Sequence, residues 1–542
     1  MIEDLNEFES GKSLAFDVCI VGAGPAGITI ANEFIGSGIR VCLVESGGYG
    51  EELETQALYQ GENVGHSVVM DEGRYRVFGG SATRWGGRCA ALDPIDFEAR
   101  DWIHKSGWPI NRATLSPFYE RAKVINNFLE PWLPDAEVPK SLGVELPSFG
   151  SADVNPFIWR VAEADIAPSF WWSPGHRKRF DWGRAYRDKL TTDQDTFVLL
   201  HANLTAFQSS DDGLNIESLT VTSLNGVTMD IQAKAFVLCC GGIENVRLLL
   251  NASKDILRRV NEFDNLGRYL AQHPRGSIAT LLTNPETADR LQHLFTDFLR
   301  PRGVQYEIGF ALSERAQRER GLVNASAAIY YAARPESAWR SGARLKDALK
   351  TKASYAGMLR DVANVVSNGG SVTANTWRRF RGRAEIFPDP LVTILVDLEQ
   401  EPNPQSRVTL SVEKDRLGMN RAKVDWRISE IERTTARYFS GFIADVLRRL
   451  GLGDSKPSPW LSSDVPVRDG ELSGTFHFIG ATRMSKDPRD GVVDENCCAH
   501  GIKNLYFAGC SVFPTGGHAN PTLTIIALAI RLADHLRARL RN

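Results

Sequence analysis

The hydrophobic positions near the start of the chain fall into two short runs, separated by a glycine-rich turn and a helix-compatible stretch. The first run, FDVCIV, enters the turn GAGPAG, and the second, IRVCLVE, ends in the acid Glu45. This order, with about twenty residues from turn to acid, is typical of a dinucleotide-binding βαβ unit. In such a unit Gly22 allows the tight turn, Gly24 lets the backbone approach a pyrophosphate, and Gly27 lets the helix contact the sheet. Glu45 would accept hydrogen bonds from the adenosine ribose, which argues against NADP.

Alternating apolar and polar positions, rich in β-branched residues, predict four strands in the middle of the chain. We expect them at 304–308, 324–331, 391–398 and 407–412. Together they should form the largely antiparallel sheet of a second domain. A further apolar run, AFVLCC, leads into Gly241 and indicates a buried strand followed by a turn.

The C-terminal pattern, TLTIIALAIRLADHLRARL, has the periodicity of a long helix and follows Asn520 and Pro521. Asn is a common N-cap and Pro at the first helical position loses no hydrogen bond, so a helix is expected to begin here. Its positive end would suit a flavin, because reduction gathers negative charge around N1 and the C2 carbonyl. Taken alone, Asn520 could simply be a helix cap.

A second glycine block narrows the choice of dinucleotide. It reads RVFGGSATRWGGRC from Arg76 to Cys89, and NAD enzymes with a Rossmann fold have no evident use for it. With this block and both chain ends in view, the sequence resembles the glucose-methanol-choline (GMC) oxidoreductases, FAD enzymes that act on alcohols. The matching pieces are GAGPAG with Glu45, GGSATRWGG, AFVLCCGGIENVRLLL and the block from His477 to Ala533. They follow the family's order and span nearly the whole chain.

The resemblance implies two catalytic positions. His477, in HFIGATRM, looks like the active-site histidine, and Asn520 occupies the second position, which holds His or Asn in different members. A neutral imidazole can take the hydroxyl proton of an alcohol while the carbon gives hydride to flavin N5, and Asn520 would hold the alcohol oxygen. Without the motif, a hydrogen-bonded core histidine would be the commoner interpretation of His477.

Three other histidines lie near these motifs. His518 could compete with Asn520, but the NPTLT pattern favours Asn520 and leaves His518 as a pocket residue at most. His273, which precedes Pro274, is expected in a structural turn, and His500 in a loop.

The cofactor implied by the resemblance is FAD, and we expect it to be noncovalent. Some relatives tether FAD through a histidine in the GGSATRWGG block; in the branch containing pyranose oxidases that position aligns with Arg84, and arginine cannot make the bond. Cys510 is expected to pack rather than to react. The expected cofactor-binding residues are Gly22, Gly24, Gly27, Glu45, Gly79, Gly80, Ser81, Thr83, Arg84, Leu204, Gly241, Asp494, Gly509, Cys510, Pro521 and Thr522.

The expected fold class is α/β, with a discontinuous Rossmann-like FAD-binding domain and an α+β substrate-binding domain. The first domain is assigned residues 14–110, 196–275 and 470–542, and the second residues 111–195 and 276–469. A chain of 542 residues with ordinary apolar content is long enough for two domains with a large core.

Composition limits the partners and the compartment. The net charge of −3 does not suggest nucleic acid, and the eight cysteines show neither metal-ligand spacing nor a secreted disulfide framework. The acidic N-terminus is not a secretory signal, and no apolar run is long enough to span a membrane. We therefore expect a cytoplasmic protein without a bound metal, with a partner subunit or a homo-oligomer left open.

Two stretches are unusual. Residues 170–183 crowd aromatics and cations together, and they could stack on sugar rings or, more commonly, pin a loop by packing. Residues 334–383 form a basic insert with helix-compatible sequence, which could dock an acidic partner, a membrane face or an anionic substrate, or could be a solvated cover over the pocket.

The details of GGSATRWGG and HFIGATRM place the chain nearest the bacterial pyranose oxidases and the glycoside 3-oxidases or dehydrogenases. We accordingly expect oxidation of a sugar or glycoside secondary alcohol, at pyranose C2 or C3, to the ketone. The alternatives are a non-sugar alcohol, a non-redox enzyme like the hydroxynitrile lyases, and a flavin-binding protein without turnover. No motif selects the electron acceptor among oxygen, a quinone, an artificial acceptor and a protein.

Overall fold

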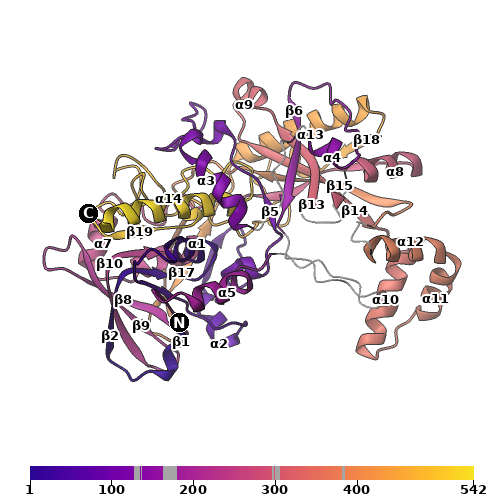
Figure 1. Ribbon diagram of the computed structural model, residues 1–542. Helices are drawn as coiled ribbons and strands as arrows, with labels where there is room; N and C mark the ends of the chain where they lie inside the picture. The colour runs from indigo at the N-terminus through magenta and orange to yellow at the C-terminus, as the bar shows by residue number, and fades with distance from the viewer. Residues whose placement is uncertain are drawn as a thin grey trace.

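A mainly parallel sheet, assembled from distant parts of the chain, forms the first half of the molecule (Figure 1). The computed structural model describes every residue except 127–134, 136, 163–179, 296–297, 300–304, 381–384 and 542. The strand order is β1-β7-β3-β2-β10-β9-β8, and β19 pairs with β10. The strands are β1 (Ile2–Asp4), β2 (Lys12–Val21), β3 (Val41–Val44), β7 (Thr196–Leu200), β8 (Asn203–Ser209), β9 (Ile216–Thr222), β10 (Thr228–Leu238) and β19 (Leu505–Phe507).

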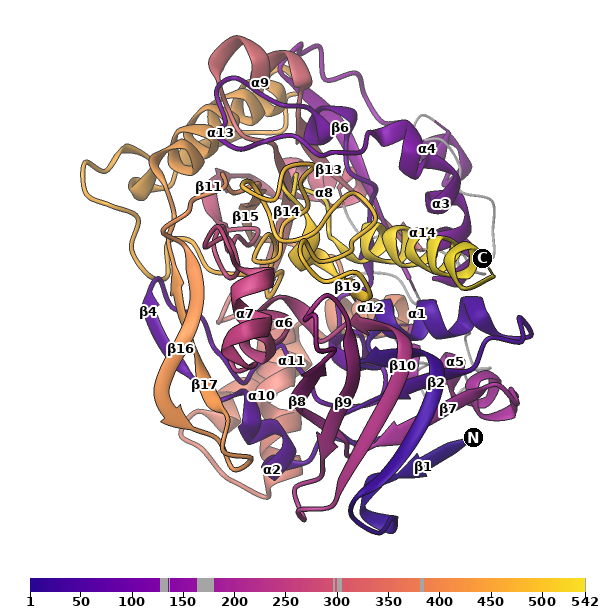
Figure 2. The same ribbon diagram turned by 90° about the vertical axis from the view of Figure 1, so that its left-hand side faces the viewer.

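Helices from both chain ends cover this sheet. All four residues of β3 are buried, as expected for a parallel strand covered on both faces. Helix α1 (Pro25–Phe34) packs against α14 (Thr522–Arg541), and α14 packs against α3 (Arg112–Ile125). Figure 2 shows α14 between α3 and α1. The first and last α-helices of the chain are therefore neighbours.

The helices α3 and α5 (Trp182–Thr192) lie in the range 111–195 that the sequence assigns to the substrate-binding domain, yet both pack on the first half. Helix α5 contacts α1 and β7. Helix α3 is tied to α14 by the Tyr119 hydroxyl, 2.8 Å from Thr524 Oγ1, and by an ion pair of Arg121 with Asp534. The range 111–195 is therefore shared between the two halves.

The second half is an antiparallel sheet in the order β18-β11-β15-β14-β13-β6-β5, with β12 beside β13. Helix α13 (Glu430–Arg449) covers one face, and all eight residues of β13 are buried. The strands are β5 (Arg88–Cys89), β6 (Val154–Val161), β11 (Arg275–Leu282), β12 (Phe298–Leu299), β13 (Gln305–Leu312), β14 (Ala325–Ala333), β15 (Pro390–Leu398) and β18 (Asp454–Pro457). The strands expected near 304–308, 324–331 and 391–398 are β13, β14 and β15.

The strand expected at 407–412 forms, but the prediction of its sheet is wrong. It is β16 (Arg407–Lys414), which pairs with β17 (Asn420–Trp426), and β17 pairs in parallel with β4 (Glu62–Gly65). This separate three-stranded sheet contacts α6 (Gly241–Leu250) of the first half. An alternating pattern identifies a strand but not its partner, because pairing is set by contacts distant in sequence.

The C-terminal helix begins slightly later than expected. Its first backbone hydrogen bond runs from Ile525 N–H to the Pro521 carbonyl, 2.8 Å, so Pro521 and not Asn520 takes the cap position. Asn520 lies immediately before the helix, and its side chain is free of the capping role.

The basic insert folds as three helices that project away from both sheets in Figure 1. They are α10 (Ala338–Thr351), α11 (Met358–Ser367) and α12 (Gly369–Phe380). Most of the aromatic stretch 170–183 lies outside the described residues; Trp182, at the start of α5, is buried. The remaining helices are α2 (Leu53–Gln56), α4 (Val138–Ser141), α7 (Lys254–Val260), α8 (Pro285–Leu294) and α9 (Glu314–Arg320).

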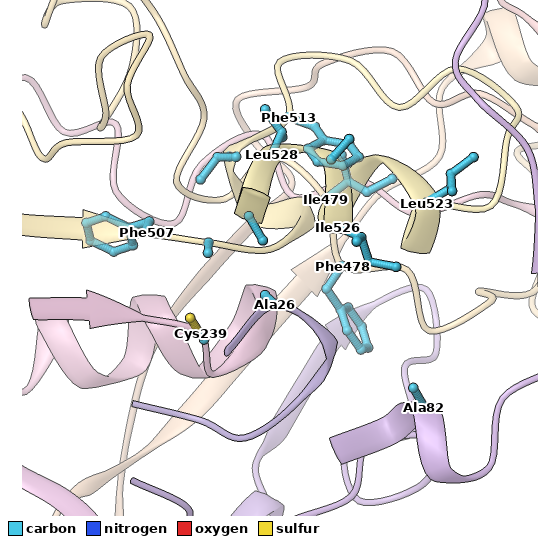
Figure 3. Close-up of a cluster of buried hydrophobic side chains, with 14 of the residues drawn as sticks. Ala26, Ala82, Cys239, Phe478, Ile479, Phe507, Phe513, Leu523, Ile526 and Leu528 are labelled. Carbon is cyan, nitrogen blue, oxygen red and sulfur yellow. The ribbon is translucent and has the colours of Figure 1, made fainter. Parts of the chain in front are cut away.

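Segments far apart in sequence meet in one hydrophobic cluster. Figure 3 shows Ala26 of α1, Cys239 after β10, Phe478, and Leu523 and Ile526 of α14 close together. All five are buried. The N-terminal, middle and C-terminal glycine and histidine motifs are thereby fixed relative to one another. Across the described part of the chain, no helix combines the length and apolar character needed to cross a membrane.

Candidate active site

A cavity of about 1010 Å³ is lined by residues of both halves. This volume is at the upper end of the range for small-molecule pockets, about 300–1,000 Å³. The predicted site residues that line it are Gly22, Gly24, Glu45, Gly80, Ser81, Arg84, Leu204, Gly241, His477, Gly509, Cys510, Asn520, Pro521 and Thr522. The structure therefore brings together the glycine blocks and the two predicted catalytic residues.

Four predicted site residues do not line the cavity. Gly27 and Gly79 have packing roles: an added Cβ would lie 2.0 Å from the Gly22 carbonyl oxygen at Gly27 and 2.6 Å from the Gly183 nitrogen at Gly79. Thr83 donates its hydroxyl to the Gly80 carbonyl, 2.9 Å. Asp494 accepts backbone hydrogen bonds within its own turn, from residues 496 and 498. Gly27 lets α1 pack against the Gly22 turn, and the other three shape local backbone, so none of the four contributes to the cavity surface.

Glycines open the cavity wall to a ligand. Gly241 and Gly509 have φ of 82° and 124°, and an added Cβ at either would find no atom within 4 Å. Gly80 lies against Gly24, where an added Cβ would come within 2.8 Å of the Gly24 Cα. A ligand can thus approach the main chain directly at these positions.

Helix N-termini also reach the cavity. Helix α1 begins after Gly24 and α6 after Cys240, and neither cap residue makes a side-chain hydrogen bond to the helix. Pro521 and Thr522 bring the start of α14 to the same cavity. Exposed N–H groups and the helix dipole favour anionic groups at such ends. This donor set fits the pyrophosphate and the flavin ring of FAD.

Glu45 is placed as a ribose-binding acid would need to be, since it is buried and lines the cavity. Its carboxylate accepts hydrogen bonds from the N–H groups of Ala23, 2.9 Å, and Gly47, 3.0 Å. Burial raises the pKa of the carboxyl, and these backbone donors oppose that rise. Glu45 is therefore held in one orientation next to the glycine turn.

A buried ion cluster that no sequence motif predicts lies beside Glu45. The carboxylate of Glu244 pairs with Arg74, 3.1 Å, Arg76, 2.9 Å, and Arg247, 3.0 Å. Burial alone would raise the pKa of Glu244, but the three guanidinium groups outweigh it and lower the pKa to about 2. Arg74 and Arg76 both lie over the ring of Tyr59. The cluster stiffens this wall of the cavity.

The imidazole of His477 is held through one nitrogen. Its Nδ1 lies 2.9 Å from His273 Nδ1 and 3.0 Å from Thr475 Oγ1. Its Nε2 has no hydrogen-bond partner among the described residues, and His477 lines the cavity. Burial, reinforced by His273, holds the pKa of His477 well below its ordinary value of 6.5. The imidazole is therefore neutral at neutral pH.

The surrounding acceptors decide which nitrogen of His477 carries the proton. His273 Nε2 lies 3.3 Å from the Gly516 carbonyl, which can only accept, so the neutral His273 carries its proton on Nε2 and accepts at Nδ1. Thr475 donates its hydroxyl to the His273 carbonyl, 3.1 Å, and so offers His477 only a lone pair. Both neighbours require a proton on His477 Nδ1. Its Nε2 is left with a free lone pair.

Two sequence interpretations of histidines need correction. His273 is more than a turn residue, because it contacts His477 directly. His518 is not a pocket residue: it is buried, does not line the cavity, and its Nε2 pairs with Asp93 at 3.1 Å. His273 and His477 are 204 positions apart, and no local sequence pattern predicts their contact.

The wall formed by the antiparallel sheet is polar. Arg88 of β5 makes a bidentate ion pair with Glu307 of β13, and its Nη2 donates to the Tyr330 hydroxyl, 2.5 Å. Arg275 of β11 and Gln305 of β13 also line the cavity. These side chains present fixed donors and acceptors to anything that enters from this side.

The cysteine beside the predicted cofactor-binding motifs is a thiol. Burial raises the pKa of Cys510 to about 12, and its Sγ contacts the Phe478 carbonyl. All eight cysteines of the chain are free. A protonated thiol is a poor nucleophile, so Cys510 has a packing role.

Comparison with known proteins agrees with the fold and with FAD as the cofactor. The family model described as GMC oxidoreductase matches residues 402–529, and the model described as FAD binding domain matches residues 15–56. A 2-methyl-1,2-propanediol dehydrogenase of Mycolicibacterium austroafricanum is 24% identical over 96% of this chain and 95% of its own. A 6'''-hydroxyparomomycin C oxidase of Streptomyces lividus is 25% identical, covering 96% and 92%.

Two further matches support less: one covers only part of the relative, and the other shows the fold alone. The large subunit of a fructose dehydrogenase of Gluconobacter japonicus is 24% identical over 56% of this chain, but the match spans only 47% of that subunit. The crystal structure of pyridoxine 4-oxidase from Mesorbium loti superposes with a TM-score of 0.54 at 16% identity, covering 96% of this chain and 99% of the other, which shows a common fold.

The fold, the cavity and these matches define an FAD-dependent oxidoreductase that acts on CH–OH groups. Residues 402–529 match the GMC oxidoreductase family model, and the relatives that match over nearly the whole chain support the same family.

Proposed function

We propose that this enzyme oxidises a secondary alcohol of a sugar or glycoside, at pyranose C2 or C3, to the ketone, with His477 as the general base. The observation that carries the proposal is the neutral imidazole of His477, whose Nε2 lone pair is free at the cavity while Nδ1 is held by two acceptors. FAD, when bound, accepts the hydride from the alcohol carbon.

The protein residues divide the remaining work. His477 Nε2 takes the hydroxyl proton, and the Asn520 amide donates a hydrogen bond to the alcohol oxygen. The protonated imidazole keeps its Nδ1–H on His273 and Thr475, which are already oriented to accept it. His273 is thus a positioning residue, because it fixes the tautomer of the base without touching the substrate.

The cofactor is proposed to bind noncovalently. The candidate tether position holds Arg84, which forms an ion pair with Glu51 at 2.7 Å. His477 is the one histidine among the described residues that line the cavity, and we assign it to catalysis. The glycines, Glu45 and the helix N-termini supply the donors and acceptors that FAD needs without a covalent link.

The polar wall supports a polyol as the substrate. Arg88, Glu307 and Tyr330 offer donors and acceptors on one side of the cavity, the arrangement that several adjacent hydroxyls can satisfy. Relatives named for a diol and for an aminoglycoside match over nearly the whole chain, and one named for fructose matches over part of it. These groups already pair with one another, so a substrate with several hydroxyls adds hydrogen bonds to an oriented network.

The test is an anaerobic visible spectrum before and after addition of glycosides, monosaccharides and simple alcohols. We expect bleaching of the oxidised-flavin band by a pyranoside, and loss of bleaching with the 2-deoxy or the 3-deoxy analogue identifies the carbon oxidised. Readmitting air, or adding a quinone or a protein acceptor, then identifies the electron acceptor. Turnover of a substrate with the flavin still oxidised would instead support a lyase.

A further inference from the structure

Helix α11 of the basic insert exposes a large part of its apolar surface. Its apolar residues Leu359, Val362 and Val366 are 86%, 44% and 76% exposed, and their spacing of three and four puts them on one face. The inward side is mixed: Asp361 and Asn364 face α10, and Val365 lies beside Gly342 of that helix. A surface helix of a globular protein normally buries the apolar face, so this face is built for a partner.

The inward face is held by a polar network with α10. Asp361 accepts hydrogen bonds from Ser341 Oγ, 2.8 Å, and Arg344 Nε, 2.8 Å, and Asn364 Nδ2 donates to Ser341 Oγ, 3.0 Å. These contacts fix the rotation of α11 about its axis. Because these contacts hold one side of α11 against α10, the side that carries Leu359, Val362 and Val366 faces outward.

The segment that carries this stripe has an excess of positive charge. The segment 338–380 contains eight Lys and Arg residues and two Asp residues, in a chain whose net charge is −3. Exposed cations that make no ion pair within the described part of the chain are Lys346, Lys350, Lys352 and Arg360. Leu349 of α10, 76% exposed, is another apolar side chain among them. Cations interspersed with exposed aliphatic side chains are the signature of an interfacial membrane segment.

The insert is anchored at the edge of the cavity. Asn375 of α12 hydrogen bonds both backbone groups of Ile386, at 2.8 and 2.9 Å, and the rings of Trp339 and Phe387 lie 6.5 Å apart. Phe387 lines the cavity, as does Tyr331 on the strand that leads into the insert. Whatever binds the insert is thereby held near the cavity.

We propose that the helices α10–α12 form a docking surface for an anionic lipid bilayer. The aliphatic side chains of α11 enter the headgroup region and the lysines and Arg360 bind the acidic headgroups. A second copy of the chain fits less well, because a two-fold contact would bring the same cationic surface against itself. A protein partner would have to be both acidic and apolar over this stripe.

The experiment is co-sedimentation of the full FAD-loaded chain with phosphatidylcholine vesicles, with and without phosphatidylglycerol. We expect binding only with phosphatidylglycerol, and a loss of roughly tenfold or more in the double variant Leu359→Glu/Val366→Glu. The matched control is Val412→Glu, at a residue 93% exposed on β16, which should bind like the parent. Retained FAD absorbance shows that each variant is folded.

A second pair of variants tests the charge. Lys350→Glu/Lys352→Glu should weaken binding by roughly tenfold or more, while Lys254→Glu/Lys503→Glu, at exposed positions outside the insert, should not. The proposal is overturned if vesicles do not bind, or if the insert variants bind as well as the parent. It is also overturned if a poly-glutamate peptide binds in place of vesicles, or if sedimentation velocity shows a dimer that Leu359→Glu/Val366→Glu dissociates.

Discussion

At the scale of single residues, proton positions decide the chemistry. The Gly516 carbonyl fixes the tautomer of His273, and His273 fixes that of His477. The Gly516 carbonyl can only accept a hydrogen bond, and His273 Nδ1 is then also an acceptor. The proton of His477 is therefore fixed on Nδ1 before any substrate binds. Such preorganisation avoids a reorganisation cost during the reaction.

We predict that His477→Ala lowers the rate of flavin reduction by roughly 10²–10⁴-fold, the usual worth of a general base. FAD content should be unchanged, because the cofactor contacts come from other residues. Stopped-flow reduction and the flavin-to-protein absorbance ratio measure both quantities. His500→Ala is the control, and loss of FAD in His477→Ala would mean that this residue mainly supports the cofactor.

The role of His273 predicts a difference between two replacements. His273→Asn keeps an acceptor near the position of Nδ1, whereas His273→Leu leaves His477 Nδ1 with Thr475 alone. We expect kcat to fall more in His273→Leu than in His273→Asn, with KM little changed in either. Equal kcat values in the two variants would contradict tautomer control.

The pH dependence follows from the direction of the pKa shift of His477. The active form is neutral and the pKa lies below 6.5, so kcat/KM should be flat from pH 7 upward with respect to this group and fall only on the acid side, below 6.5. Because His273 contributes to that lowering, the acid limb should move to higher pH in His273→Leu. A pH profile of kcat/KM for parent and variant checks both statements.

At the scale of elements, the glycines of the βαβ unit and of α6 divide into packing and lining positions. Gly27 lies where an added Cβ would collide with the Gly22 carbonyl, whereas Gly241 faces open cavity. The sequence identifies the two glycines from separate motifs, GAGPAG and AFVLCCGG, and a motif gives spacing but not which glycine faces a ligand.

We predict that Gly241→Ala weakens FAD binding by more than backbone strain alone would, because the added methyl group enters the space of the cofactor. Gly226→Ala is the matched control: Gly226 has φ of 86°, close to the 82° of Gly241, and an added Cβ there also meets nothing, but it lies in a hairpin away from the cavity. Both variants should lose about 1 kcal/mol of stability from the left-handed backbone. Only Gly241→Ala should lower FAD occupancy after gel filtration, and equal occupancy would remove Gly241 from the cofactor site.

Local patterns in the sequence predicted local structure well. Patterns within short stretches of consecutive residues predict the βαβ unit and the four middle strands, and these elements form close to the expected ranges. The placement of β16 in a separate sheet and the packing of α3 and α5 on the first half depend on contacts with distant segments. The contact of His273 with His477 is of the same kind, which is why Pro274 suggested only a turn.

At the scale of the whole molecule, residues of both halves line the cavity, and each half is built from several separate segments of the chain. FAD bound there would contact elements from the N-terminal, middle and C-terminal segments. Removing FAD should therefore lower the unfolding temperature, and restoring it at a hundredfold excess over Kd should return about 2.7 kcal/mol. Calorimetry of apo and reconstituted protein measures this, and identical unfolding temperatures would mean that FAD does not bind the native state in preference to the unfolded chain.

The protonation state of the thiols that line the cavity affects how fast the enzyme is inactivated by oxidation during turnover. Burial raises the pKa of Cys510 to about 12 and also raises the pKa of Cys240. Peroxide attacks thiolates far faster than thiols. If oxygen accepts the electrons, the hydrogen peroxide released beside these residues meets them in their least oxidisable form, and the cavity resists inactivation by its own by-product.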